Sequence, residues 1–264
     1  MHIASRNSIK LFIRFPNFLT PIPTITRSFH NSTYKMTSIN DLSENQWKPQ
    51  DAIPQFVKDL ITPDLKSSKP INHLIAFLQI ISSLKFQKRT GWMDHGIPKF
   101  ETESIADHMY RMSILSMIVP PSTVNKDKCV KIAIIHDIAE CLVGDITPFA
   151  GINKNEKHRR EKDTIEYLKT IIEPYNSEFA KEMVELWFDY EEIRNIEARY
   201  VKDIDKFEMI QTAYDYELKF GITYDLEQFY TAKSAIKTKE VKELCDAVLE
   251  KRQKLIEGLK KEKK

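Results

Sequence analysis

Apolar residues recur at the three- and four-residue spacing of helices along most of this chain, and no segment shows the strict alternation typical of strands. The spacing predicts a short helix over 56–61 and longer ones over 71–84, 104–119, 127–143, 156–172, 177–188, 193–220, 226–235 and 241–259. Ser104 with Asp107 three residues later predicts a capping box at the start of one helix, and Gly144 predicts the end of another. Residues 88–103 are predicted to be a polar loop. The fold class predicted is all-α.

The same pattern divides the chain into four parts. Residues 1–40 are predicted to be a leader outside the fold, and 41–69 a proline-rich arm with one short helix. Residues 70–235 are predicted to form a single helical bundle, and 236–264 a C-terminal helix with a Lys-rich tail. Of 264 residues, 42% are hydrophobic, which is enough for a sizeable core in this one domain.

Charge is distributed unevenly between the leader and the remainder. The first 35 residues contain five basic residues, no acidic ones and many hydroxyl side chains, whereas the net charge of the whole chain is only +2. This composition is typical of a mitochondrial targeting segment. The alternatives are a disordered basic tail, or an extension ahead of a cytoplasmic protein that begins at Met36.

Composition also excludes several classes of function. The chain has 6 Gly, and it contains neither a P-loop nor a G-x-G-x-x-G dinucleotide fingerprint. Cys129, Cys141 and Cys245 are far apart, so we expect three reduced, partly buried thiols in a reducing compartment. No apolar run approaches the roughly 20 residues of a membrane span, so we expect no membrane partner. Without the leader the chain is slightly acidic, and we therefore expect no nucleic-acid partner.

Polar residues interrupt the most apolar predicted helix. His136 and Asp137 lie in the middle of 127–143, and Glu140 follows one turn later. A buried carboxylate must be paired, hydrogen-bonded or bound to a metal, because leaving it alone costs several kcal/mol. Either a metal site or a His–Asp pair that serves only the core fits these residues.

Two further residues favour the metal site. His108 lies near the start of the capped helix, and Asp205 lies on the helix predicted over 193–220 between apolar neighbours. Helices brought together could place His108, His136, Asp137 and Asp205 around one ion. Two imidazoles and two carboxylates suit Mn, Fe, Co or Zn and, less well, Mg.

These elements resemble the signature of the HD-domain metal-dependent phosphohydrolases. The residues around this signature are more specific than the signature itself. They resemble the HD-domain-containing protein 2 family, relatives of the bacterial 5′-deoxynucleotidases of the YfbR type. The segments that carry the resemblance are Arg89 to Trp92, Glu103 to Met112, His136 to Ile146, Lys157 to Glu161 and Val201 to Asp205. The match runs from about Ile71 to about Tyr230, so 70–235 would be the HD phosphohydrolase domain.

The resemblance implies hydrolysis of deoxyribonucleoside 5′-monophosphates to deoxynucleoside and phosphate, with Mn, Co or Mg as the divalent ion. His108, His136, Asp137 and Asp205 would hold this ion, with Asp137 and Glu140 as catalytic residues. A second, Mg-like ion would be held by Glu140, Asp145 and the carbonyl of Ile146; alternatively, Asp145 is a loop residue that caps a turn. Arg89 would bind the phosphate and Trp92 the sugar or base.

Other readings remain open on sequence grounds. The protein could act on another small nucleotide, or could be a non-catalytic helical interaction module. The cluster His158, Arg159 and Arg160 is either an exposed helix face or a phosphate-steering patch. The resemblance also implies a homodimer, for which the apolar residues Leu186, Trp187, Phe188 and Tyr190 are the predicted seam.

Overall fold

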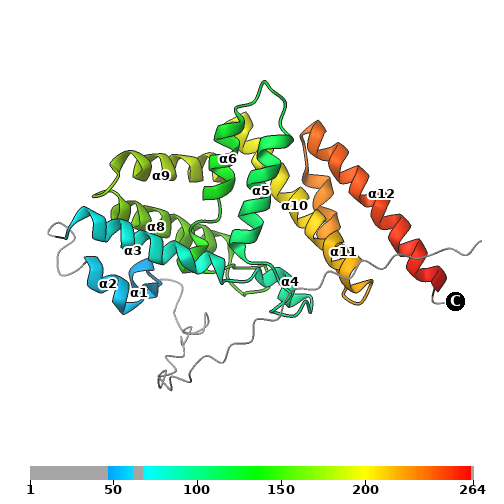
Figure 1. Cartoon of the computed structure of the whole chain (residues 1–264), viewed down its shortest axis with the longest axis horizontal. Coiled ribbons are helices and arrows are strands. Elements are labelled where there is room, and N and C mark those ends of the chain that lie inside the picture. The colour runs from blue at the N-terminus through cyan, green and yellow to red at the C-terminus, as the bar shows by residue number, and fades with distance from the viewer. Residues whose placement is uncertain (1–46, 62–67, 263–264) are drawn as a thin grey trace, which may run out of the picture. The chain divides into compact units, whose positions relative to one another are not determined.

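The computed structural model describes residues 47–61 and 68–262, and within these ranges it is built of helices with no strand (Figure 1). The predicted all-α class is confirmed. The leader over 1–40 lies outside the described residues. The helices are α1 Pro49–Ala52, α2 Gln55–Ile61, α3 Pro70–Ile81, α4 Thr90–Asp94, α5 Ile105–Ile118, α6 Lys126–Ile135, α7 Glu140–Val143, α8 Lys154–Ile172, α9 Ser177–Glu192, α10 Ile196–Phe220, α11 Glu227–Tyr230 and α12 Lys239–Glu262, with 3-10 turns η1 Ser82–Lys85 and η2 Thr231–Ala235.

Helix α10 is the central element, because α5, α6, α9 and α12 all pack against it (Figure 1). Its N-terminus is capped by the side chain of Asn195, and α5 begins with the predicted capping box of Ser104 and Asp107. These caps satisfy backbone N–H groups that have no partner within a helix, and each contributes about 1 kcal/mol. The capping box thus fixes the start of α5 about one turn before His108, and the Asn195 cap fixes the start of α10, the helix that contains Asp205.

The single helix predicted over 127–143 is wrong. Helix α6 ends at Ile135, a tight turn follows, and α7 begins at Glu140. In the turn the N–H of Ile138 donates to the carbonyl of Ile135, and the N–H of Glu140 donates to that of Asp137. Adjacent residues of a continuous helix diverge by about 100°. The break instead lets His136 and Asp137 face one cavity, and Gly144 ends α7 with φ of 81°, a conformation that favours glycine.

The predicted loop over 88–103 is also partly wrong, because it contains the short helix α4. The N–H of Thr90, the first residue of α4, donates to the Asp145 carboxylate. A sequence search for long amphipathic periods misses a five-residue helix that a distant carboxylate stabilises.

The proposed dimer seam on α9 is wrong as well. Leu186, Trp187 and Tyr190 are buried in the core of this chain, and Phe188 is partly buried against it. The sequence pattern predicts an apolar surface on this helix, but α8, α6 and α10 of the same chain cover it. This face is therefore not available to a second copy.

One apolar core joins the arm, the central helices and the C-terminal helix. Ile53 and Val57 of the arm, and Val241 and Cys245 of α12, belong to the same buried cluster. All three cysteines are free and buried, as predicted. None of the helices in the part of the chain described here is long and apolar enough to cross a membrane.

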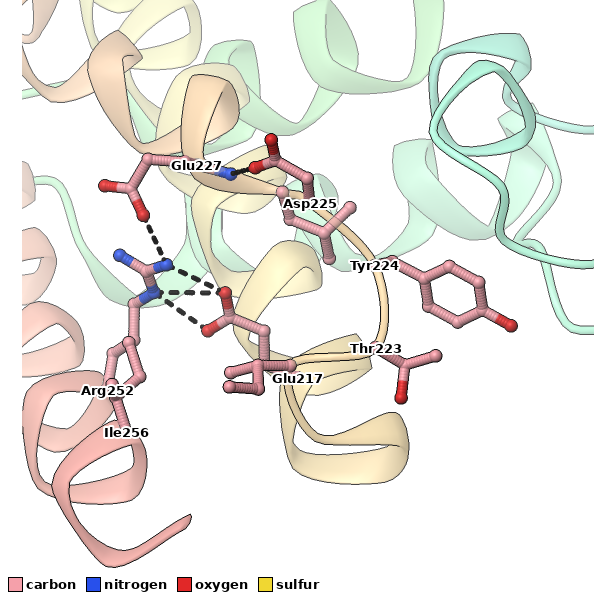
Figure 2. A pocket seen from close by; sticks show the side chains of 9 residues that line it. Glu217, Thr223, Tyr224, Asp225, Glu227, Arg252 and Ile256 are labelled. Atoms are coloured by element: carbon pink, nitrogen blue, oxygen red, sulfur yellow. Dashed lines mark hydrogen bonds and ion pairs between the residues drawn. The ribbon is translucent and has the colours of Figure 1, made fainter. Parts of the chain in front are cut away.

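An ion-pair network anchors α12 beside α10. Figure 2 shows Arg252 of α12 reaching Glu217 of α10 and Glu227 of α11, with N–O distances of 2.8 and 2.7 Å. The Tyr230 hydroxyl also donates to Glu217, at 2.9 Å. Because Glu217 is buried, both partners are needed to offset the cost of removing its charge from water. The network holds α11 and η2, which line the cavity described below.

Candidate metal centre and active site

Two buried histidines present the same ring nitrogen to one point between α5 and the end of α6. His108 and His136 have ring centroids 5.5 Å apart, and both side chains are almost fully buried. Nδ1 of His108 contacts the Glu208 carboxylate at 2.5 Å, and Nδ1 of His136 contacts the Ala133 carbonyl at 2.9 Å. A carbonyl or carboxylate oxygen accepts, so both Nδ1 atoms carry hydrogen. The Nε2 atoms are the ones left to bind a ligand.

Carboxylates converge on these two Nε2 atoms. Oδ2 of Asp137 lies 3.1 Å from Nε2 of His136 and 3.9 Å from Nε2 of His108. Oδ1 of Asp205 lies 3.3 Å from Nε2 of His108, while its Oδ2 accepts a hydrogen bond from Tyr190. The ligand atoms of His108, His136 and Asp137 all lie within 4.8 Å of one another. The structure thus brings together the four residues predicted as ligands of the first ion.

Neither Nε2 atom has a hydrogen-bond partner in the described residues. A buried polar atom without a partner costs about 1–3 kcal/mol, and here two such atoms face carboxylates. A divalent cation would satisfy the imidazole lone pairs and the carboxylate charges together. The donor set of nitrogen and oxygen atoms suits Mn, Co or Zn, so the residues present fit the predicted metal.

The protonation states of the centre respond to the same charges. Burial opposes ionisation of Asp137, but His136, Arg89 and His108 outweigh it and hold the pKa of Asp137 well below its usual range. Burial likewise opposes the charge on Asp205, and His108 lowers its pKa. For His108, burial and Arg89 disfavour the charged form, yet Glu208 and Asp205 raise its pKa to about 10. Without a divalent ion, a proton on His108 is therefore the cation that these carboxylates hold.

The residues predicted for a second ion lie beside the first group. Glu140 is buried, its Oε2 has no hydrogen-bond partner among the residues that the structure describes, and burial together with Asp137 and Asp145 raises its pKa well above the usual value. Nζ of Lys157 lies 3.2 Å from the Ile146 carbonyl oxygen and 4.0 Å from Oε1 of Glu140. One oxygen of Asp145 accepts from the N–H of Thr90 at the N-terminus of α4, which is a distant helix and not the next turn of its own loop. An ammonium group therefore contacts two of the three predicted ligands.

Arg89 and Trp92 take different positions around the centre. Nη1 of Arg89 lies 3.3 Å from Oδ2 of Asp137, and its side chain is 18% exposed, so the guanidinium borders both the metal centre and open space. Trp92 is 2% exposed, donates from Nε1 to Glu103 and packs on Phe229 with centroids 4.2 Å apart. Its contact with substrate stays a prediction.

A single cavity of about 890 Å³ contains these groups, which is within the usual size range of small-molecule sites. Arg89, Asp137 and Glu140 line one part of it, and aromatic residues line another. Acidic side chains, the Arg89 guanidinium and three lysines, Lys154, Lys157 and Lys202, share its wall. Such a wall suits a small anionic molecule that carries an apolar group.

A family model described as "HD domain" matches residues 81–245. The chain belongs to the HD-domain family. The resemblance to HD-domain-containing protein 2 is confirmed by the relatives found. The 5′-deoxynucleotidase YBR242W of Saccharomyces cerevisiae is 48% identical over 215 residues, which are 81% of this chain and 87% of the relative. The 5′-deoxynucleotidase HDDC2 of Homo sapiens is 44% identical over 144 residues, or 54% of this chain and 68% of the relative.

Solved structures agree with the fold. The HD domain-containing protein YGK1 has a TM-score of 0.63 and 38% identity, covering 80% of this chain and all of that one. The PH0347 protein of Pyrococcus horikoshii has a TM-score of 0.54 and 28% identity, covering 69% of this chain and 99% of that one.

The sequence analysis did not predict several residues that contact the candidate metal ligands. Glu208 supports His108, Tyr190 donates to Asp205, and Lys157 faces Glu140. Glu208 lies three residues after Asp205, one helical turn away, which is the signal that could have found it. Lys157 is part of a segment that carries the resemblance, but nothing in its spacing assigns it to the site.

The residues His158, Arg159 and Arg160 were predicted to be either an exposed helix face or a phosphate-steering patch, and the structure places them differently. His158 lines the cavity, stacks on Trp187 with centroids 5.5 Å apart and contacts Glu191. Arg159 pairs with Glu156 and Asp163, and Arg160 is buried against Glu156. Of these three residues only His158 lines the cavity, where it could approach an anionic ligand.

Proposed function

We propose that this HD-domain protein is a metal-dependent 5′-deoxynucleotidase, which hydrolyses deoxyribonucleoside 5′-monophosphates to deoxynucleoside and phosphate. The observation that carries the proposal is the pair of unpartnered Nε2 atoms of His108 and His136 facing Asp137 and Asp205, beside Arg89. The curated relatives named 5′-deoxynucleotidase support the substrate class.

The residues of the chain divide the work of phosphomonoester hydrolysis. His108, His136, Asp137 and Asp205 would hold the divalent ion, which lowers the pKa of water and polarises the phosphoryl group when bound. Arg89 offers a planar fork of N–H donors to the phosphoryl oxygens. The free Oε2 of Glu140 is available to accept a hydrogen bond from the attacking water and orient it. Asp137, between His136 and Arg89, aligns the metal centre with the phosphate subsite.

Mn, Co and Mg are the metals we propose to test, with Mg as the second ion at Glu140, Asp145 and Ile146. The experiment measures phosphate release from a panel of 5′-nucleotides with each metal. We expect activity on dAMP and dTMP that EDTA abolishes. The double variant His136→Ala with Asp137→Ala should lose it, while Asp127→Ala, an exposed acid on the preceding helix α6, should keep it. Equal activity of parent and double variant would refute the enzymatic function.

The assembly and cellular address are separate proposals. We propose that the protein is a homodimer, as the family resemblance implies. Light scattering coupled to gel filtration should give twice the mass of one chain, and a single-chain mass would refute it.

We also propose that residues 1–40 direct the protein to mitochondria. Fusing them to a reporter should send the reporter there, whereas a diffuse cytoplasmic signal would favour a start at Met36.

A further inference from the structure

Aromatic rings line the cavity near the C-terminal end of α4, the end opposite to Arg89. Arg89 and His95 flank the two ends of this short helix. At about 1.5 Å per residue, roughly 9 Å of helix separates them. A nucleoside 5′-phosphate separates its phosphorus from its base by a methylene and a sugar ring. A phosphate bound at Arg89 therefore leaves the base within reach of His95.

The rings come from three separate segments. His95 lies 4.8 Å from Phe229 of α11 and 6.1 Å from Phe149, measured between centroids. Phe149 is on the loop after α7, the same loop that begins with Asp145 and Ile146. Four residues of chain span at most about 14 Å, so this loop also extends from the predicted ion ligands toward the aromatic group.

Phe149 is 67% exposed, although it lines the cavity. The loop beneath it is held in place, because Thr147 donates its hydroxyl hydrogen to Asp94 and the N–H of Ala150 donates to the Thr147 carbonyl. A large apolar ring on an anchored loop is left open to water at a substrate cavity. A flat apolar ligand placed against it would remove that surface from water.

A polar group stands at the edge of these rings. Nδ1 of His95 donates to the Gly91 carbonyl, so its Nε2 is an acceptor, and the amide N–H of Gln228 donates to it. Gln228 is itself exposed on the cavity wall, with its amide oxygen and second N–H directed at no other group in the described residues. One donor and one acceptor can be matched by the edge of any nucleobase.

We propose that these residues form the subsite for the nucleobase of the substrate, with stacking on the rings and one amide at the base edge: His95, Phe149, Gln228 and Phe229. This inference rests on the proposed function, since it assigns the part of the nucleotide that does not react. Stacking is available to every base, and the amide can turn to suit each edge. The subsite therefore binds a base strongly and distinguishes weakly among bases.

The test compares substrates with and without a base. In the parent protein, kcat/KM for dAMP and dTMP should exceed that for 2-deoxyribose 5-phosphate, which retains the phosphate and sugar. Phe149→Ala should raise KM for both nucleotides by roughly 5- to 100-fold, the range of a lost base–aromatic stack, and leave kcat/KM for the sugar phosphate unchanged. Phe100→Ala, an 84% exposed ring outside the cavity, is the matched control and should change neither.

Binding without turnover separates this proposal from the proposed function. Saturation-transfer NMR of dAMP with EDTA-treated protein should show the strongest transfer at the base protons, and Phe149→Ala should reduce it. Transfer to the base without hydrolysis in any metal would refute the nucleotidase and leave the subsite standing. Equal kcat/KM for dAMP and 2-deoxyribose 5-phosphate, or an equal loss on both in Phe149→Ala, would overturn the subsite.

Discussion

Nδ1 of His108 lies 2.5 Å from Oε2 of Glu208, and both side chains are buried between α5 and α10. Arg111 approaches the other oxygen of Glu208, with its Nε 2.8 Å away. The carboxylate therefore fixes the orientation of the imidazole and leaves Nε2 facing Asp137 and Asp205. Carboxylates in this position raise the basicity of a metal-bound histidine.

Glu208→Gln tests this relationship. The amide keeps the size and one acceptor oxygen but removes the charge, so we expect Mn affinity to fall about 10-fold or more. Isothermal titration with Mn measures it directly. Asp215→Asn, which alters a second carboxylate partner of Arg111 at a half-exposed site, should bind Mn as the parent does. Unchanged affinity in Glu208→Gln would mean that the contact has no part in metal binding.

Metal affinity should rise with pH. The pKa of His108 is raised to about 10 in the metal-free protein, so below that pH a cation must displace its proton. One proton released per ion makes the apparent affinity for Mn increase about tenfold per pH unit between pH 6 and 8. Titrations in buffers with different heats of ionisation count the protons. A pH-independent affinity with no proton release would contradict the assignment of His108 as a ligand.

Lys157→Met should strengthen binding of the second ion. The Lys157 ammonium contacts the Ile146 carbonyl and faces Glu140, so it competes with a cation for the same oxygens. Removing its charge should lower the Mg concentration for half-maximal activity severalfold. Lys154→Met, a change at another lysine of the cavity wall, is the control. A higher Mg requirement in Lys157→Met would instead mean that the lysine supports the ion.

Arg89→Lys should weaken substrate binding although the charge is kept. A lysine cannot form the two parallel bonds of a guanidinium, so we expect KM for dAMP to rise about 10-fold. Steady-state phosphate release measures the change. Arg159→Lys, at an arginine paired with Glu156 and Asp163 outside the cavity, should leave KM as it is. If both variants behaved alike, Arg89 would not bind the phosphate.

The sequence was sufficient for the helical class and for choosing four side chains that the structure brings together, His108, His136, Asp137 and Asp205. Helical spacing and the Ser104 capping box are local signals, and burial of His136 and Asp137 among apolar neighbours was a reliable sign of a paired or metal-bound group. The interruption between α6 and α7 could not be predicted, because the apolar pattern continues through it.

The partners of the centre depend on tertiary packing. Glu208 meets His108 across 100 residues of sequence, and Asp145 meets Thr90 across 55. The spacing of Glu208 from Asp205 indicates a shared helix face but not the contact with His108, and the pairing of Asp145 with Thr90 has no such signal. The sequence could not predict that Leu186 and Trp187 are buried within this chain. An apolar helix face has the same sequence pattern whether it packs against the same chain or against another.

Anomalous diffraction from crystals grown with Mn tests the central claim most directly. We predict one strong peak about 2 Å from Nε2 of His108, Nε2 of His136 and the carboxylates of Asp137 and Asp205. A protein that binds Mn elsewhere, with no peak among these four side chains, would contradict the metal centre on which the proposed function depends.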